Sequence, residues 1–395
     1  MSVLPAEARL LFLATRPVAF SDDASLAALS KTPLNWSTIG QLAEREKLLP
    51  VLWGRLRNHS GAIPPRVADA FQRQAVVTEF RMAMMGTVLE RAVAMLAADG
   101  ISVMLLKGAA LATTVYPSFG QRPMGDLDIL VRREDAQRAW ERMRDAGWTI
   151  EPEFAGDAAF HESHHHLPPL VDPRGLKLVL EIHRALLPVE SPCVLAVDDV
   201  WRDARQVALG ASAVWVPSDL HQLLHLCVHF AWSHMLEGGV ARTVRDVATL
   251  IEAGDIDWPE FVALATRARA ATCAYWTLAL TRTLGGAPVP DAAMEVLRPR
   301  QPIALTHALE RGYIMTGLVR ACPSVRVAQL MWSTGVRPDA SGHGSARPWH
   351  TCERFKDAFH VGRIPTLGAR VQAHLRGIAA WFRFATLLSV PRRVI

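Results

Sequence analysis

The sequence predicts an α+β fold in which a small mixed-sheet core lies between an N-terminal and a C-terminal helical region. Apolar residues recur three and four positions apart on both sides of the middle of the chain, which is the helical period. The middle itself holds short apolar runs bounded by glycine and proline, which is typical of buried strands. Half of the 395 residues are hydrophobic and 21% are charged, so the chain has enough apolar material for large cores.

The chain divides into four segments. Residues 1–97 are predicted to form a helical cap that leads into the next unit, with one break at a Pro-Pro pair. Residues 98–217 alternate between strand and helix patterns and form the α/β core. Residues 218–290 are helical again, beginning at a Ser-Asp capping signal, and form a substrate-side domain. Residues 291–395 are mixed and mostly helical.

The elements expected within the core follow in the order strand, helix, strand, helix, strands. They are a strand over 101–108, a helix over 109–116, a strand over 127–131, a helix over 134–147, an edge strand over 148–154 and a strand over 176–183. The helix over 134–147 has acidic residues at its start and Gly147 at its end, as the helix dipole and C-terminal capping favour. This order predicts a mixed sheet.

Charge and cysteine usage limit the function classes. The formal charge of +5 fits an anionic partner such as a nucleotide, but the cations lie along the whole chain, so no stable nucleic-acid binding is expected. Five scattered cysteines without a CxxC pair predict reduced thiols in a cytoplasmic protein. The N-terminus is interrupted by Glu7 and Arg9, so a signal peptide is not expected there. No uncharged apolar stretch reaches about 18 residues, so no transmembrane segment is expected.

The strongest local signal is an acidic pair, Asp126 and Asp128, at the start of an apolar strand. In a strand, residues two apart project from the same face, so the two carboxylates repel each other unless something neutralises them. Mg²⁺, or Mn²⁺ in its place, prefers carboxylate oxygens and substrate phosphates and is the expected neutraliser. An Asp cap followed by an exposed strand-end Asp is the structural alternative, and it would be preferred for the pair taken alone.

A strand ending in Lys107 and Gly108 precedes this pair closely, and a helix follows at once. Glycine lets a phosphate approach the backbone, and the free N–H groups at a helix start attract anions. Lys107 adds a positive charge, so a phosphate-binding turn is predicted beside the metal-binding pair. An ordinary strand-to-helix turn is the alternative for Gly108.

Glu181 is the third acidic candidate, because it sits in the otherwise apolar strand LVLEIHRAL. A carboxylate in a buried strand needs a partner, and a metal shared with the two aspartates would supply one. A salt bridge with Arg184 or Lys177 is the alternative. His183 lies two residues after Glu181, shares its face and is a further candidate.

Two groups of histidines are candidates for metal or substrate contacts. The first contains His161, His164, His165 and His166, and the second contains His221, His225 and His229. The first group is close in sequence to the strand of Glu181 and is expected near the site. The second lines one helix face, and because no HExxH motif is present, helix packing is favoured over a zinc site.

These motifs resemble the bacterial uncharacterised nucleotidyltransferase family of the DNA polymerase β-like superfamily. The similar segments are LLKGAALATTVYPSFGQRPMGDLDILV, a helix ending in AGW, LEIHRALL and the helical segments up to about residue 290. The resemblance covers roughly residues 20–290. The superfamily pattern is a hydrophobic residue, Gly, then Gly or Ser; next an acid-hydrophobic-acid strand; and later a third acid. Lys107–Ala109, Asp126–Asp128 and Glu181 resemble these three parts.

The resemblance also assigns two further positions. Ala109 stands where the superfamily usually has Gly or Ser, so backbone N–H groups and Lys107 would replace a phosphate-contacting hydroxyl. Arg122, in the loop before the carboxylates, resembles a family position and is a candidate phosphate contact. A solvated loop arginine is the alternative for Arg122.

The resemblance implies Mg²⁺-dependent transfer of a nucleoside monophosphate from an NTP to an acceptor, with Asp126, Asp128 and Glu181 as metal ligands. The acceptor is an unidentified small molecule, peptide or protein. One alternative is a nucleotide-binding regulator or toxin–antitoxin component with weak or no catalysis, which Ala109 favours. Another is a helical interaction protein with a structural DxD motif.

Overall fold

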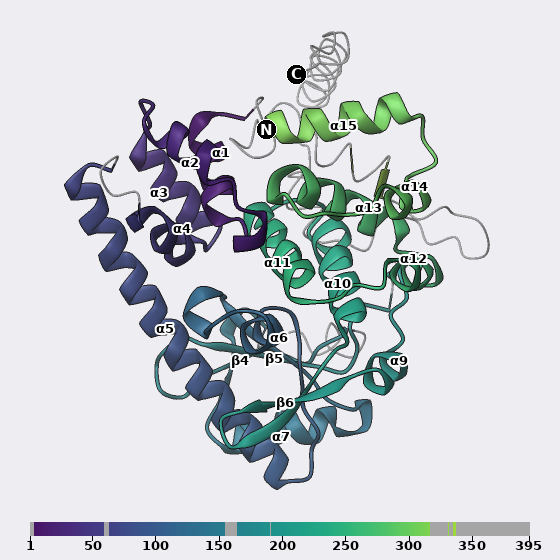
Figure 1. Cartoon of the computed structure of the whole chain (residues 1–395). Helices are drawn as coiled ribbons and strands as arrows, with labels where there is room; N and C mark the ends of the chain where they lie inside the picture. The colour runs from purple at the N-terminus through teal and green to yellow at the C-terminus, as the bar shows by residue number, and fades with distance from the viewer. Residues whose placement is uncertain are drawn as a thin grey trace, which may run out of the picture.

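The structure is a computed structural model that describes residues 4–58, 63–154, 164–189 and 191–316, together with 331, 335 and 336. Helices surround one seven-stranded mixed sheet, which confirms the predicted α+β class (Figure 1). Within the described part of the chain, no helix has the length and apolar character needed to cross a membrane.

The N-terminal region is helical, as predicted. Its helices are α1 (Ala6–Thr15), α2 (Asp23–Ser30), α3 (Trp36–Arg45), α4 (Leu49–Leu56) and α5 (Pro65–Ala98). The Asn35 side chain caps α3 by accepting from Thr38 N, and α5 begins with proline at its first turn, where a missing N–H costs nothing. At 34 residues, α5 is long enough to run from the other N-terminal helices to the far end of the sheet (Figure 1).

The seven strands all lie between residues 104 and 216 in the order β3-β4-β5-β2-β1-β7-β6. The strands are β1 (Met104–Leu105), β2 (Asp126–Leu130), β3 (Thr149–Ile150), β4 (Leu170–Val171), β5 (Val179–His183), β6 (Arg205–Leu209) and β7 (Ser212–Val216). β2 runs parallel to β5 and antiparallel to β1, so the sheet is mixed. The predicted edge strand is present as β3. The predicted strand over 101–108 is shorter, because the chain turns into helix at Lys107.

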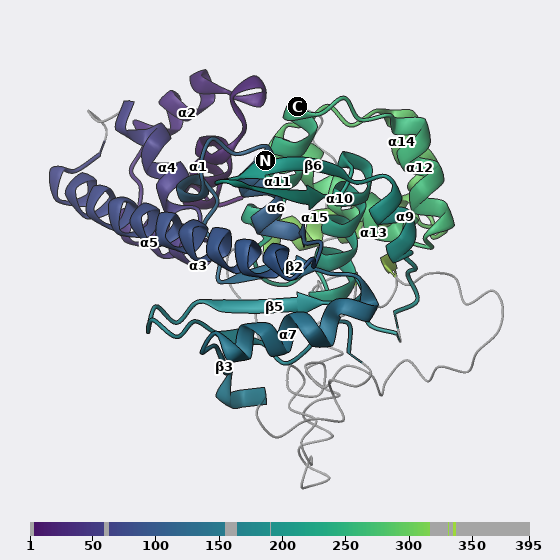
Figure 2. The same ribbon diagram turned by 90° about the horizontal axis from the view of Figure 1, so that it is seen from below.

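The helices of the core are α6 (Lys107–Thr114), α7 (Ala136–Asp145) and α9 (Val197–Arg202). Apolar side chains that alternate with the acidic ones on β2 and β5 form a buried cluster with α5 and α7. Figure 2 shows the ribbons of these strands and helices. The members from the strands are Leu127, Ile129, Leu180 and Ile182. One face of the sheet is therefore an apolar support, and the other face carries the polar side chains.

The C-terminal helices are α10 (Asp219–Val228), α11 (Val240–Ala253), α12 (Trp258–Arg267), α13 (Ala271–Leu280), α14 (Asp291–Leu297) and α15 (Ile303–Thr316). α10 continues into a π-helical turn at His229–Ser233. One hydrophobic cluster combines buried residues of α1–α4 with buried residues of α10–α15. The two helical regions therefore pack together over the core, although the core separates them in sequence (Figure 1).

Candidate active site

The acidic residues converge on two neighbouring parallel strands. Asp128 of β2 is the register partner of Glu181 of β5, and Asp126 and His183 each lie two residues from one of these. Register partners in parallel strands project from the same side of a sheet, so all four side chains share the polar face. Geometry thus places Glu181 on the face that the alternation of the strands predicted.

Asp128 is the centre of a buried polar network. Its Oδ1 accepts hydrogen bonds from Lys107 Nζ at 2.7 Å and from His183 Nε2 at 2.9 Å. His183 Nε2 also lies 3.4 Å from Glu181 Oε2, so one imidazole edge contacts both carboxylates. Asp128 is 3% exposed and His183 is fully buried. The buried negative charge is therefore matched by the Lys107 ammonium rather than left unpaired.

The network fixes which groups carry charge. Burial alone would favour protonation of Asp128, but Lys107 and His183 hold the pKa of Asp128 well below its usual range. Burial likewise opposes ionisation of Glu181, yet the hydrogen bond from His183 lowers the pKa of Glu181. Both carboxylates are thus ionised at neutral pH.

Asp126 differs from the other two acids, because it keeps an exposed face at the start of β2. The protein around it still removes part of its hydration, and together with repulsion from Asp128 this raises the pKa of Asp126. Lys107 acts in the opposite direction with less effect. Asp126 is therefore the acid of the site that gains most from a bound cation.

The donor set fits a divalent cation. Asp128, Glu181 and His183 each offer a ligand atom, and these atoms all lie within 4.8 Å of one another. Within the described residues, both hydrogen bonds to the Asp128 carboxylate go to Oδ1, so Lys107 and His183 do not engage Oδ2. Carboxylate oxygens suit Mg²⁺ and Mn²⁺, and an added imidazole shifts the preference towards transition metals. Asp126 lies outside this close group, although it shares the strand face.

The predicted phosphate turn lies at the start of α6, beside β2. Lys107 has a left-handed φ of 45°, which is unusual for a side chain of its size. A Cβ at Gly108 would lie 3.3 Å from both Arg122 Nη1 and Met124 Sδ, so close packing favours glycine there. Ala109 is 1% exposed and packs in the cluster of α5. The first N–H groups of α6 have no acceptor within the helix and attract anions.

Arg122 lies in a buried ion pair. Its Nε and Nη2 donate to the two oxygens of Asp246 on α11, each at 2.7 Å, and Nη1 donates to the Pro123 carbonyl at 2.8 Å. The Tyr116 hydroxyl donates to Asp246 as well. The alternative of a solvated loop arginine is wrong, since Arg122 is 7% exposed. Contact with a phosphate stays a prediction for its remaining donors.

The histidines of the first group lie at the site, apart from His161, which is outside the described residues. His166 forms a β-bridge with His183, and its Nε2 lies 4.0 Å from Glu181 Oε2. The ring of His165 stacks at a tilt 5.2 Å from the ring of His183. The ligand atoms of His164, His165 and His166 also lie within 4.8 Å of one another.

The second group of histidines, on α10 and the π-helical turn, makes packing contacts, as the sequence predicts in preference to a zinc site. His221 Nδ1 lies 2.9 Å from the Ser218 hydroxyl, and His229 Nε2 lies 3.1 Å from His234 Nε2. His225 is buried, and its Nε2 has no hydrogen-bond partner among the described residues. The three do not form a metal-binding group within the part of the chain that the structure describes.

We expect acid to destabilise the fold between about pH 6.5 and 4. Burial lowers the pKa of five histidines, to about 4 for His166 and about 3 for His225; the others are His165, His221 and His229. Below the unfolded pKa of about 6.5, the unfolded chain binds protons that these folded histidines do not bind, so stability falls as pH falls. The raised pKa of His183 has the opposite effect, since its contribution is complete below pH 6.5 and is lost as pH rises.

His225 alone should cost about 1.4 kcal/mol of unfolding free energy at pH 5.5 relative to neutral pH. Urea denaturation at pH 7.5 and 5.5 measures this, and the His225→Leu variant should lose about 1.4 kcal/mol less than wild type. Equal stability of wild type at the two pH values would contradict the prediction.

Two cations near the site, Lys47 and Arg242, are not among the site residues that the sequence predicted. Lys47 lies in the turn between α3 and α4, and Arg242 lies in the first turn of α11. Nothing in the local sequence marks Lys47 as functional. The Gly-Gly pair before α11 could have indicated a tight turn ahead of Arg242, but not its proximity to Asp126.

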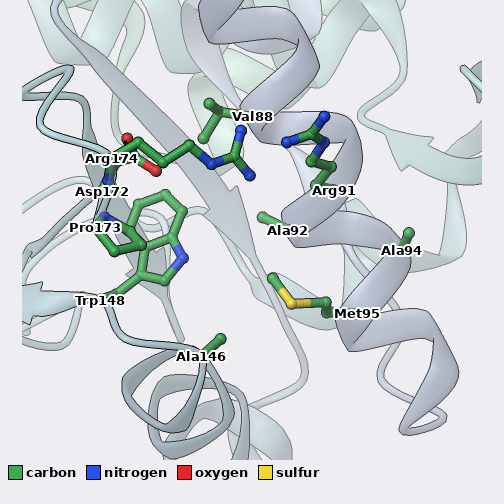
Figure 3. A pocket seen from close by; sticks show the side chains of 10 residues that line it. All are labelled: Val88, Arg91, Ala92, Ala94, Met95, Ala146, Trp148, Asp172, Pro173 and Arg174. Atoms are coloured by element: carbon green, nitrogen blue, oxygen red, sulfur yellow. Dashed lines mark hydrogen bonds between the residues drawn. The ribbon is translucent and has the colours of Figure 1, made fainter.

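A pocket of about 470 Å³ lies on the other face of the sheet, between α5 and the segments that flank β3 and β4. Figure 3 shows Arg91 and Arg174 reaching into it towards each other above Trp148. Val88 and Ala92 of its wall belong to the apolar cluster beneath the sheet. This pocket is therefore separate from the carboxylates.

A model of the family described as "Uncharacterised nucleotidyltransferase" matches residues 32–286, well over half of the chain. No curated protein and no solved structure matches the chain. The matched range contains every residue of the site described above. It also agrees with the resemblance over roughly residues 20–290 that the sequence motifs predicted.

Proposed function

Since the chain belongs to the uncharacterised nucleotidyltransferase family, we propose that it transfers a nucleoside monophosphate from an NTP to an acceptor in a reaction that requires Mg²⁺ or Mn²⁺. The observation that carries the proposal is the parallel pairing of Asp128 with Glu181 beside the start of α6. This arrangement supports the proposal, because paired carboxylates suit a hard cation and the start of a helix suits a phosphate.

Each residue of the site would have a distinct role in this reaction. Asp126, Asp128 and Glu181 would hold the divalent ions, which when bound lower the pKa of the acceptor hydroxyl and neutralise phosphate charge. The backbone N–H groups at the start of α6 would bind phosphate oxygens. Glu181 would accept the proton of the acceptor hydroxyl, as its lowered pKa leaves it ionised. The acceptor oxygen bonds to the α-phosphorus, the bond to the β-phosphate breaks, and pyrophosphate leaves.

His183 would act as a positioning residue. Its Nε2 contacts both Asp128 and Glu181, and its ring is fully buried. A carboxylate pair held by one imidazole edge loses little side-chain freedom when a cation binds, which favours binding.

Lys107 would change partners during the reaction. It neutralises Asp128 in the structure, and its ammonium carries the charge that a phosphate at the start of α6 would meet. If Asp128 also served as a metal ligand, its negative charge would be shared, and its ion pair with Lys107 would be weaker. Lys107 would then be available for the phosphate, as the family resemblance implies.

A nucleotide-binding regulator with weak catalysis is the second candidate. Two observations favour it: Lys107 already neutralises Asp128, and buried Ala109 offers no hydroxyl to a phosphate. On this alternative the chain binds NTP with a divalent cation but releases no pyrophosphate with any acceptor.

We expect NTP binding to need a divalent cation, with affinity about 100-fold lower in EDTA, because phosphates and ionised carboxylates repel each other without it. Calorimetric titration of each NTP with Mg²⁺, with Mn²⁺ and with EDTA measures this. Incubation with each labelled NTP and cell extract as the acceptor source, beside a pyrophosphate assay, separates enzyme from regulator. Equal NTP affinity with and without metal would rule out both and leave an interaction protein.

A further inference from the structure

We propose that Lys47 and Arg242, from the two helical regions, form a cationic subsite that binds the β- and γ-phosphates of the NTP beside Asp126. The inference rests on the proposed function for the identity of the ligand, and it names residues outside the α/β core as the polyphosphate contacts. Three observations support it. The two side chains lie near Asp126, a hydrogen bond holds the turns that carry them side by side, and neither side chain has a hydrogen-bond or ion-pair partner among the described residues.

Lys47 extends over the residue that precedes the first site carboxylate. A Cβ at Gly125 would lie 2.7 Å from Lys47 Nζ, so the ammonium rests on the bare backbone next to Asp126. Lys47 itself has a left-handed φ of 56°. This conformation belongs to the C-terminal cap of α3, where the Leu48 N–H donates to the Ala43 carbonyl at 2.8 Å, and the cap fixes the turn that carries Lys47.

Arg242 reaches the same region from α11. The turn before this helix has two left-handed glycines, and a Cβ at the second, Gly239, would lie 2.7 Å from Arg242 Nη2. The guanidinium therefore folds back over the glycine turn, where any other residue would collide with it. Its electrostatic neighbours are Arg122, Asp246, Glu46, Asp126 and Lys47.

A hydrogen bond to a buried side chain joins the two turns that carry these cations. Glu46, which precedes Lys47, accepts a hydrogen bond from the backbone N–H of Ala241 at 2.9 Å, and Ala241 precedes Arg242. Glu46 is 5% exposed. The turn of Lys47 and the first turn of α11 are thus held side by side, which limits the freedom that the cations lose when they bind a ligand.

Neither cation has a hydrogen-bond or ion-pair partner among the residues that the structure describes. Burial and the nearby Arg242 lower the pKa of Lys47, and burial lowers the pKa of Arg242. Two partly buried like charges close together are unfavourable unless an anion lies near them. The carboxylates near Arg242 are Asp246, Glu46 and Asp126. Asp246 is held by Arg122, Glu46 accepts hydrogen bonds from Arg45 and Ala241, and Asp126 is a proposed metal ligand. The subsite therefore fits a ligand with several negative charges.

The segment that connects the α6 turn to Asp126 favours a polyphosphate as that ligand. Gly108 packs on Arg122 and Met124, and Gly125, one residue further, packs under Lys47. A phosphate at the start of α6 and a cation over Gly125 therefore border one short stretch of chain. A chain of phosphates can bridge the two, whereas a single phosphate can occupy only one of them.

The test uses inorganic tripolyphosphate, which carries the polyphosphate chemistry without a nucleoside. Calorimetry with Mg²⁺ on the full chain should show that Lys47→Gln and Arg242→Gln each weaken tripolyphosphate binding about 10-fold, the usual loss for one charged hydrogen bond. Lys47→Arg should keep most of the affinity. AMP binding should change by less than about twofold in every variant, since its single phosphate does not reach the subsite.

The matched control is the double variant Arg91→Gln with Arg174→Gln, which removes two cations that also face each other but lie on the opposite face of the sheet. It should bind tripolyphosphate as wild type does. Gly125→Ala gives a second test, since its Cβ would displace the Lys47 ammonium without removing the charge. It should weaken tripolyphosphate binding as Lys47→Gln does.

Two outcomes overturn the inference. One is tripolyphosphate affinity in Lys47→Gln and Arg242→Gln equal to that of wild type, and the other is no tripolyphosphate binding by wild type. Both leave the proposed function open, because NTP-dependent pyrophosphate release is measured separately. Conversely, wild type that binds tripolyphosphate through these cations but never releases pyrophosphate would contradict the transferase proposal alone.

Discussion

Asp126→Asn is expected to lower the rate of pyrophosphate release by about 1,000-fold or more without destabilising the fold. The change removes one charge from the proposed metal ligands and keeps the shape of the side chain. Asp126 makes no hydrogen bond or ion pair within the described residues, and its raised pKa shows that the fold does not favour its charge. Removing that charge also relieves repulsion with Asp128. A pyrophosphate assay and urea denaturation measure the two effects.

Asp128→Asn should behave differently, although both residues belong to one DxD motif. Asp128→Asn should lower the rate of pyrophosphate release as much as Asp126→Asn does. It should also lower the free energy of unfolding by about 3–5 kcal/mol, because the Lys107 ammonium would be left buried without its partner. Asp198→Asn is the control, since that side chain is 97% exposed, and it should change neither quantity. Activity retained in Asp126→Asn would refute the metal-ligand role of Asp126.

Asp246→Ala is expected to cost about 3–5 kcal/mol of unfolding free energy, among the largest losses for a single substitution in this chain. Asp246 is 2% exposed and accepts two hydrogen bonds from Arg122 and one from Tyr116. Truncation leaves the Arg122 guanidinium buried without a counter-charge. Urea denaturation of wild type and variant measures the loss.

If the loss in Asp246→Ala comes from the unpaired charge of Arg122, removal of both charges should restore stability. The double variant Arg122→Met with Asp246→Leu should recover most of the stability, because it removes both buried charges and fills the space with apolar groups. Disruption of the exposed pair of Arg202 and Asp199 by Asp199→Ala should cost less than about 1 kcal/mol. A loss below about 1 kcal/mol in Asp246→Ala would show that the pair contributes little.

The strand alternation predicted which side chains of one strand share a face, but it does not encode that β2 pairs with β5, which only the family resemblance suggested. The structure brings Asp128, Glu181 and His183 together, with Asp126 outside this close group. The family match and the mixed sheet confirm the predicted fold class. The roles of the residues in metal and phosphate binding stay predictions.

The remaining features depend on contacts between residues far apart in sequence, which local patterns do not encode. Arg122 is paired with Asp246, 124 residues later, and no local signal connects the two. The sequence also suggested that Asp126 and Asp128 repel each other until a metal arrives, whereas Lys107 already neutralises Asp128. The hairpin of β6 and β7 was not predicted, because its exposed strand β6 lacks a long apolar run.

The hydrogen bond from Ala241 to Glu46 joins positions 195 residues apart, with the whole sheet between them in sequence. The protein is synthesised from its N-terminus, so a nascent chain can complete β2 and β5 long before α11 leaves the ribosome. Until then Lys47 has no Arg242 beside it, and Arg122 has no counter-ion. An incomplete chain therefore displays the acidic cluster with Lys47 and Lys107 but without Arg242. If Lys47 and Arg242 bind a polyphosphate as proposed, this capacity would arrive late in translation, only when α11 has been made.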